Sequence, residues 1–424
     1  MTERSAISVN GRDYQWPTAP VVVICCDGSE PDYTEQAMND GVMPNLTRIV
    51  GAGENLLCRS VVPSFTNPNN LSIVTGRPPS VHGISGNYLI DPDTGDEVMM
   101  NDPKFLRVPT IFQAFQEAGG KVVVLTAKDK LRLLLGKNLK FGKDGAIAFS
   151  SEKSDQCTYA DNGIEDVCAM VGMAVPDVYS AELSEFVFAA GVKLMAAEKP
   201  DLMYLSTTDY IQHKHAPGSE GANAFYAMMD KYIGELDAAG AVIVLTADHG
   251  MNAKHLPDGN PDVIYLQDVL DGQLGAGRSR TILPITDPYV VHHGALGSYA
   301  TVYLTDIADA ADTLAQLNAM DGVQKAYNKA DAAREFELPP ECIGDIVVIS
   351  EKHKVIGTTE AEHDLSGLNE PLRSHGGATE QNIPLIVNRK LNRENSDLDF
   401  DGLRNFDAFY VACNYSAWLT QAAE

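Results

Sequence analysis

The sequence predicts an α/β protein: a mostly parallel central sheet with helices on both faces, plus an inserted smaller α+β cap domain. Three observations predict it. Short runs of Val, Ile and Leu alternate with amphipathic stretches, as in sheets buried on both faces. Three of these runs end on an aspartate. The pattern changes at 256–367 and then resumes.

Five strands are expected in the first 255 residues, each a near-continuous aliphatic run. They are PVVVICCDG (20–28), LLCRSVVP (56–63), KVVVLTAKDK (121–130), DLMYLSTTDY (201–210) and AVIVLTADHG (241–250). Helical spacing of apolar residues predicts helices between them. These are PNLTRIVGAG (44–53), TIFQAFQEAGG (110–120), AELSEFVFAAGVKLMAAE (181–198) and GANAFYAMMDKYIGELDAAG (221–240).

The segment 256–367 predicts a strand, a helix and further strands, at YATVYLTD (299–306), ADAADTLAQLNAMDGV (308–323) and DIVVISEKHKVIGT (345–358). We interpret it as a cap inserted into a catalytic core formed by 1–255 and 368–424. The core is expected to end on a helix near 407–419.

Composition narrows the function classes. The 424 residues are 44% hydrophobic and 21% charged, as in ordinary globular proteins. No apolar run approaches the roughly 18 residues of a membrane span, and the first residues lack a basic-then-apolar signal pattern. The seven cysteines are scattered without a CxxC motif, and the adjacent Cys25 and Cys26 are expected to be buried. A cytoplasmic protein is therefore expected.

The net charge of −26 disfavours polyanionic partners, so we expect no nucleic-acid and no membrane binding. A small anionic substrate remains compatible with this charge, because bound metal ions reverse the field locally. The sequence is also compatible with a homodimer.

Carboxylates and imidazoles gather where strands end. In open α/β sheets the ligand crevice lies at the carboxyl ends of the strands, so these groups are expected to meet there. Mixed ligands of this kind suit zinc, with manganese or iron as competitors. We expect two divalent metal ions, one held by Asp209, His213 and His375, the other by Asp27, Asp248 and His249. Each motif alone is equally explained by a turn, a helix cap or a core histidine; the combination favours the metals.

Thr66 stands between a strand end at Pro63 and a helix start at Asn67-Pro68. Asn67 is expected to cap the helix, with Pro68 at its first position. Thr66 is then available as a nucleophile that metal coordination activates, facing a helix N-terminus that favours a phosphoryl group. The alternative for an isolated threonine is a simple turn cap.

The chain resembles the alkaline phosphatase superfamily, close to its nucleotide pyrophosphatase/phosphodiesterase branch. The resemblance rests on five motifs, in that family's order: CDG (26–28), PSFTNPNNLSIVTGRPPSVHGI (63–84), TTDYIQHKH (207–215), TADHGM (246–251) and SHGG (374–377). It implies a two-metal hydrolase with Thr66 as nucleophile and metal ligand. The Cys-x-Pro-x-Arg motif of the sulfatase branch is absent from the sequence.

Residues 66–102 closely resemble the phosphonoacetate hydrolases. This resemblance implies cleavage of the carbon–phosphorus bond of phosphonoacetate to acetate and phosphate, with Asn87 on a phosphonate oxygen. Lys128 and Lys130, two apart on an expected strand, would stabilise the enolate-like leaving group; a solvated pair is the alternative. His215 is a further substrate contact or else a surface histidine.

Two rival functions stay open. A two-metal phosphodiesterase or phosphomonoesterase needs no enolate-stabilising cations, although the sequence shows no aromatic nucleotide slot. A non-catalytic binding protein predicts that a ligand or the nucleophile is missing, and the sequence contains them all.

Overall fold

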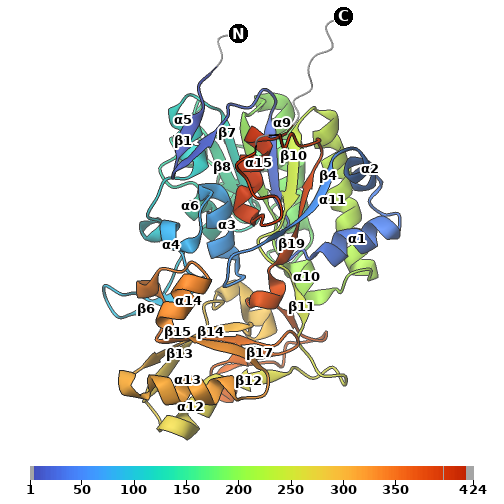
Figure 1. The fold of residues 1–424 in the computed structure, drawn as a ribbon. Helices are drawn as coiled ribbons and strands as arrows, with labels where there is room; N and C mark the ends of the chain where they lie inside the picture. The colour runs from blue at the N-terminus through green and yellow to red at the C-terminus, as the bar shows by residue number, and fades with distance from the viewer. Residues whose placement is uncertain (1–3, 395, 417–424) are drawn as a thin grey trace, which may run out of the picture.

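A computed structural model describes residues 4–394 and 396–416 (Figure 1). Its centre is a seven-stranded sheet with the strand order β4-β19-β10-β3-β9-β7-β8. The five strands from β10 to β8 are parallel, and β19 runs antiparallel to both of its neighbours. The prediction of a mostly parallel sheet is confirmed. The strands are β3 (Val21–Cys25), β4 (Glu54–Arg59), β7 (Val122–Thr126), β8 (Ile147–Ser150), β9 (Leu202–Ser206), β10 (Val242–Thr246) and β19 (Asn382–Val387).

Helices cover both faces of this sheet, which therefore has two separate apolar cores. Cys25 belongs to one core and Cys26 to the other, because successive residues along an extended chain point to opposite faces. Both cysteines are buried, as predicted. One face carries α3 (Thr66–Thr75), α5 (Ile111–Glu117), α6 (Asp129–Leu135) and α15 (Ala408–Asn414); the other carries α1 (Pro31–Asn39), α2 (Pro44–Ala52), α9 (Glu182–Glu198) and α11 (Glu220–Ala238).

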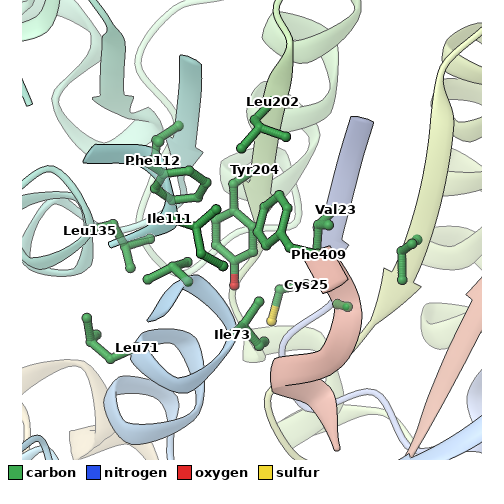
Figure 2. Close-up of a cluster of buried hydrophobic side chains, with 14 of the residues drawn as sticks. Val23, Cys25, Leu71, Ile73, Ile111, Phe112, Leu135, Leu202, Tyr204 and Phe409 are labelled. Carbon is green, nitrogen blue, oxygen red and sulfur yellow. The ribbon is translucent and has the colours of Figure 1, made fainter. Parts of the chain in front are cut away.

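Figure 2 shows part of the first core, where aromatic rings from three elements meet. The Tyr204 ring of β9 lies 5.9 Å from that of Phe112 and 6.2 Å from that of Phe409, measured between centroids. Its hydroxyl group points towards α3 and donates a hydrogen bond to Oδ1 of Asn70. This core therefore fixes the position of α3, the helix that begins with Thr66.

All five predicted strands are shorter than expected, and two of them end early for a clear reason. The first ends at Arg59 instead of residue 63, and Pro63 lacks the N–H that a ladder needs. The other ends at Thr126, whose hydroxyl donates to the backbone oxygen of Lys128 and closes a turn into α6. Lys130 is consequently helical. All four predicted helices are present, whereas α1 was not predicted. The predicted terminal helix is α15, and residues 417–419 of that prediction lie outside the described residues.

A smaller α+β unit lies beneath the central sheet in Figure 1, coloured yellow to orange. Its antiparallel sheet has the order β13-β14-β16-β15, and a parallel pair, β12 and β17, lies beside it. The fold class with an additional cap is thus confirmed. The elements are β12 (Val263–Tyr265), α12 (Leu266–Leu274), β13 (Ser279–Ile282), β14 (Tyr299–Leu304), α13 (Ala310–Asn318), β15 (Val323–Asn328), α14 (Lys329–Glu335), β16 (Ile346–Ser350) and β17 (Val355–Gly357).

Short elements join these layers. The strand pair β11 and β18 connects the cap to the core. Within the described residues, no helix is both long and apolar enough to cross a bilayer. The remaining short elements are β1 (Ile7–Val9), β2 (Arg12–Tyr14), α4 (Pro79–His82), β5 (Tyr88–Ile90), β6 (Glu97–Met99), α7 (Tyr159–Asn162), α8 (Val167–Val171), α10 (Tyr210–Lys214), β11 (Asn252–Ala253) and β18 (Arg373–Ser374).

Candidate active site

Three aspartates follow the ends of three adjacent parallel strands. Asp27 follows β3, Asp209 follows β9 and Asp248 follows β10, and all three are buried. The backbone N–H of Asp27 donates to the hydroxyl of Thr207 across the strand ends, at 2.9 Å. The strand order therefore brings together carboxylates that are up to 221 positions apart in the sequence.

Three histidines complete the cluster. His213 Nε2 lies 2.9 Å from Asp209 Oδ2, as expected for residues four apart on α10, and His375 Nε2 lies 3.5 Å from the same oxygen. His249 Nε2 lies 3.2 Å from Asp27 Oδ1. The predicted ligands from distant parts of the chain are thus adjacent in the fold.

Each of these imidazoles is oriented by the backbone. In all three rings Nδ1 lies 2.7–2.9 Å from a carbonyl oxygen, which can only accept a hydrogen bond. The Nδ1 atoms therefore carry a proton, and the Nε2 atoms face the carboxylates, an arrangement typical of metal-ligating histidines. The acceptors are Arg373 for His213, Gly250 for His249 and Ser64 for His375.

The side chains group somewhat differently from the prediction. Asp27, Asp248 and His249 have ligand atoms within 4.8 Å of one another, the set expected for one metal. Asp209 and His375 form the other compact set with His249 instead of His213. His213 keeps its contact with Asp209 but also groups with two histidines of the cap, which the sequence analysis did not single out.

The cluster fits divalent cations. Burial and the carboxylates of Asp209 and Asp248 raise the pKa of Asp27 well above its usual range. Burial opposes the charged form of His249, yet the carboxylates of Asp248 and Asp27 raise the pKa of this imidazole to about 10. Asp27 Oδ1, His213 Nε2 and His249 Nε2 are buried without a hydrogen-bond partner. A divalent cation would coordinate these unpartnered oxygen and nitrogen atoms. Its positive charge would also reduce the repulsion among the buried carboxylates.

Thr66 lies beside this cluster, but its helix starts earlier than predicted. It is the first residue of α3, after Phe65 at the N-cap, so Asn67 is not the cap. The N–H of Asn67 donates to Oδ1 of Asn87, and Pro68 has no N–H. The predicted binding of a phosphoryl group by free helix N–H groups is therefore not supported at these two positions.

A cavity opens over the metal cluster and Thr66. Lys128 and Lys130 line it, although they belong to the turn before α6 and to α6 itself, and not to one face of a strand as predicted. Asn87 also lines it, and its Oδ1 accepts a hydrogen bond from the N–H of Asn67. The full lining is Asp27, Thr66, Asn67, Asn87, Lys128, Lys130, Leu131, Thr207, Asp209, Ile285, Asp287, Val290 and His375.

His215 is not among these lining residues. Its ring packs against Gly221 at the start of α11, where a Cβ atom would lie 2.6 Å from the imidazole. The prediction that His215 contacts the substrate is therefore not supported. The alternative reading, a histidine outside the site, fits its position.

Two supporting residues were missed by sequence reasoning. Asn70, one turn after Thr66, donates to Asp248 Oδ2 at 3.1 Å and so orients this carboxylate. Gly28 has a positive φ of 71°, and a Cβ there would lie 3.0 Å from that of Asp209. An NPNN run and a DG pair are such common turn features that neither signals a site by itself.

The chain is similar to one protein family and to proteins of known structure. The model of the family described as type I phosphodiesterase / nucleotide pyrophosphatase matches residues 21–378. Structures of phosphonoacetate hydrolase from Sinorhizobium meliloti, one in complex with phosphonoacetate and one with phosphonoformate, are 58% identical to the chain. Each match covers 98% of this chain and 100% of that chain, with a TM-score of 0.93.

More distant similarity is of two kinds. Murine ectonucleotide pyrophosphatase/phosphodiesterase 5 is 19% identical over 93% of this chain and 94% of its own, with a TM-score of 0.62, which shows the fold alone. An uncharacterized pyrophosphatase/phosphodiesterase of Schizosaccharomyces pombe is 38% identical over 93 residues, 21% of this chain and only 18% of that relative. The family match spans most of the sequence, including the segments that carry the predicted ligands. The chain belongs to the type I phosphodiesterase / nucleotide pyrophosphatase family.

Proposed function

We propose that this protein hydrolyses the carbon–phosphorus bond of phosphonoacetate to acetate and phosphate. The 58% identity to the S. meliloti phosphonoacetate hydrolase, over the full length of that chain, carries the proposal. The cavity supports it, since a carboxylate- and imidazole-rich metal cluster lies at one end and two lysines line the same space. Such a cavity suits a small anionic molecule.

Two divalent ions of the zinc type would complete the centre in this proposal. Asp209, His213 and His375 would hold one, and Asp27, Asp248 and His249 the other, with Thr66 next to these ligands. Carboxylate and imidazole donors suit zinc, and manganese or iron accept the same donors. When bound, such ions polarise a neighbouring hydroxyl group and offset the charge of the phosphonate.

Thr66 acts as the nucleophile. Its hydroxyl group loses its proton to solvent, and Oγ attacks phosphorus and forms an oxygen–phosphorus bond as the carbon–phosphorus bond breaks. The NH₂ group of Asn87 donates to a phosphonate oxygen. The bonding electron pair passes to carbon and delocalises into the carboxylate as an enolate, which Lys128 and Lys130 stabilise before solvent protonates it to acetate. Water then cleaves the phosphothreonine, which restores Thr66 and releases phosphate.

The cap contributes to this cavity, so the proposed domain division bears on substrate choice. We place the cap at residues 256–367 and the core at 1–255 and 368–424. Ile285 and Val290 of the cap line the cavity, and Asp287 lies 3.7 Å from the Nζ of Lys130. A cap that closes one wall of the cavity limits the size of the leaving group.

The decisive experiment compares two substrates. We expect purified protein to release phosphate and acetate from phosphonoacetate faster than it releases nitrophenol from a nitrophenyl phosphodiester. The membership in a phosphodiesterase family is what favours the second candidate function, a phosphate ester hydrolase. Faster turnover of the diester, with no acetate formed from phosphonoacetate, would establish that candidate instead.

Lys128→Ala is expected to impair the two reactions unequally. With phosphonoacetate, kcat should fall by about a hundredfold, as when one preorganised donor to a developing charge is removed. With a nitrophenyl phosphate ester the loss should be much smaller, because an oxygen leaving group needs no enolate stabilisation. Steady-state kinetics on both substrates measure the difference. Lys140→Ala, at an exposed position, is the matched control, and equal losses on both substrates in Lys128→Ala argue against the proposed role.

Removal of the metals is expected to lower stability as well as activity. The buried carboxylates of Asp27, Asp209 and Asp248 then repel one another without a counter-ion. A ligand present at about 100 times its dissociation constant stabilises a folded protein by about 2.7 kcal/mol per site. Thermal unfolding after dialysis against a chelator should therefore occur at a lower temperature, and added Zn²⁺ should restore it. An unchanged unfolding temperature in the chelated protein would contradict a structural cation centre.

A further inference from the structure

Three histidines from the core and the cap lie together beside the metal centre. His213 belongs to α10, whereas His292 and His293 belong to the short 3₁₀ helix Pro288–His293 of the cap. The ring of His293 stacks on that of His213 with centroids 4.2 Å apart, and the ring of His292 lies 5.2 Å from that of His213. One ligand atom from each residue lies within 4.8 Å of the other two. Three imidazoles at this spacing are a ligand set for a divalent cation of the zinc type.

His293 has an unusual environment for a structural side chain. Only 1% of its surface is exposed, and neither of its ring nitrogens has a hydrogen-bond partner. A buried polar group left unsatisfied costs about 1–3 kcal/mol, so such groups usually have a partner. Because one of its ring nitrogens lies within 4.8 Å of ligand atoms of His213 and His292, a cation shared by the three imidazoles is a fitting partner.

His213 connects this set with the catalytic ligands. Its Nδ1 donates to the backbone oxygen of Arg373, so Nε2 is its only atom that can bind a metal. That atom lies 2.9 Å from Asp209 Oδ2. Because one lone pair serves one ion, a cation on His213 is completed either by Asp209 and His375 or by His292 and His293. The two sets are alternative positions of the same ion.

The cap histidines face a different cavity from the substrate. His213, His292 and His293 line a second cavity together with residues 367–373, whereas none of the three lines the substrate cavity. Gly367, Asn369 and Glu370 on its lining are exposed, so this cavity reaches the surface. Glu370 brings a carboxylate to this lining, which also includes Lys214 and Arg373.

We propose that His213, His292 and His293 form a loading site, which takes a divalent cation from solvent and passes it to the catalytic centre. Transfer exchanges the two cap imidazoles for Asp209 and His375 while His213 stays bound. The inference rests on the metal centre of the proposed function, but not on the identity of the substrate. It predicts an effect on the rate of metal uptake and none on the final metal content.

The test uses full-length protein stripped with a chelator. Zn²⁺ uptake is followed by stopped flow with a fluorescent zinc indicator, in the wild type and in His292→Gln/His293→Gln. We expect uptake to slow by about tenfold in the double variant, an effect similar to that of losing supporting residues around a metal. Zinc content at equilibrium, measured by mass spectrometry of the metal, should equal that of the wild type. His353→Gln, an exposed histidine of the cap, is the matched control and should load at the normal rate.

Two results would overturn the proposal: normal uptake in the double variant, or a lower final zinc content, which would make the cap histidines permanent ligands. Circular dichroism checks the fold, and His292→Gln alone, at a half-buried position, provides a milder variant in which slower uptake is still expected. A wild type that takes up no zinc would refute the metal centre as well. Normal zinc uptake without phosphonoacetate cleavage would refute only the proposed reaction.

Discussion

Thr66→Ala is expected to lower kcat for phosphonoacetate by on the order of a thousandfold or more, as when the nucleophile of a covalent mechanism is removed. Thr66 lines the cavity beside Asp27, Asp209 and His375, and its hydroxyl is the group from which the proposed oxygen–phosphorus bond forms. The zinc content should remain close to that of the wild type, because six carboxylate and imidazole ligands are retained. Steady-state kinetics and metal analysis on the same sample separate loss of the nucleophile from loss of metal.

Two comparisons make this result specific. Thr75→Ala removes a hydroxyl from the same helix that bonds only to nearby backbone, with Leu71 as its strongest acceptor, and should leave kcat nearly unchanged. Thr66→Ser retains a nucleophilic oxygen and should retain measurable activity. Acid quenching during turnover, followed by peptide mass spectrometry, should detect phosphate on Thr66. A fully active Thr66→Ala enzyme would rule out the covalent route.

Lys254→Met is expected to cost about 3–5 kcal/mol in the free energy of unfolding, the usual effect of breaking a buried ion pair on one side. Lys254 is fully buried directly after β11, with Nζ 2.9 Å from Glu380 Oε1 and 2.6 Å from the backbone oxygen of Lys352. Burial raises the pKa of Glu380, but the ammonium group of Lys254 opposes this effect and helps to keep that pKa below its usual value. Without Lys254 the Glu380 carboxylate has no neutralising partner in this interior. Chemical denaturation measures the loss.

An exposed ion pair provides the matched control. Arg334 and Asp331 pair on the surface of α14, and Arg334→Met should change stability by less than about 1 kcal/mol. The double variant Lys254→Met/Glu380→Leu should recover part of the loss, because it removes both buried charges. A loss below 1 kcal/mol in Lys254→Met would show that this buried pair does not stabilise the fold.

The gathering of the candidate ligands was predictable because it follows a rule of the fold. Asp27, Asp209 and Asp248 follow parallel strands, and the carboxyl ends of such strands meet at one edge wherever the strands lie in the sheet. The strand order itself, and the antiparallel β19, could not be read from the sequence, since aliphatic runs look alike in either direction. The homodimer stays a prediction.

Residues outside that rule were predicted less well. Lys128 and Lys130 line the cavity, but they do not lie on one face of a strand as predicted. The strand ends at Thr126, where a turn leads into α6. No sequence pattern marked His292 and His293 as site residues. They lie about 80 residues from His213 in the sequence, and their contact with it depends on how the cap packs on the core. His215 shares a motif with Asp209 and His213, but the structure does not place it on the lining of the cavity.

The pairing of β11 with β18 has a consequence for how such enzymes diversify. Asn252 pairs with Ser374 and Ala253 with Arg373, so the chain leaves the core and returns to it at one point. His249 lies three residues before this junction, and His375 directly after it. Replacing the segment between residues 253 and 373 would replace the cap side of the cavity. The proposed metal ligands on both sides of the junction would keep their positions. The junction thus makes the cap a module, through which descendants of one scaffold can acquire new substrates while the hydrolytic centre is inherited unchanged.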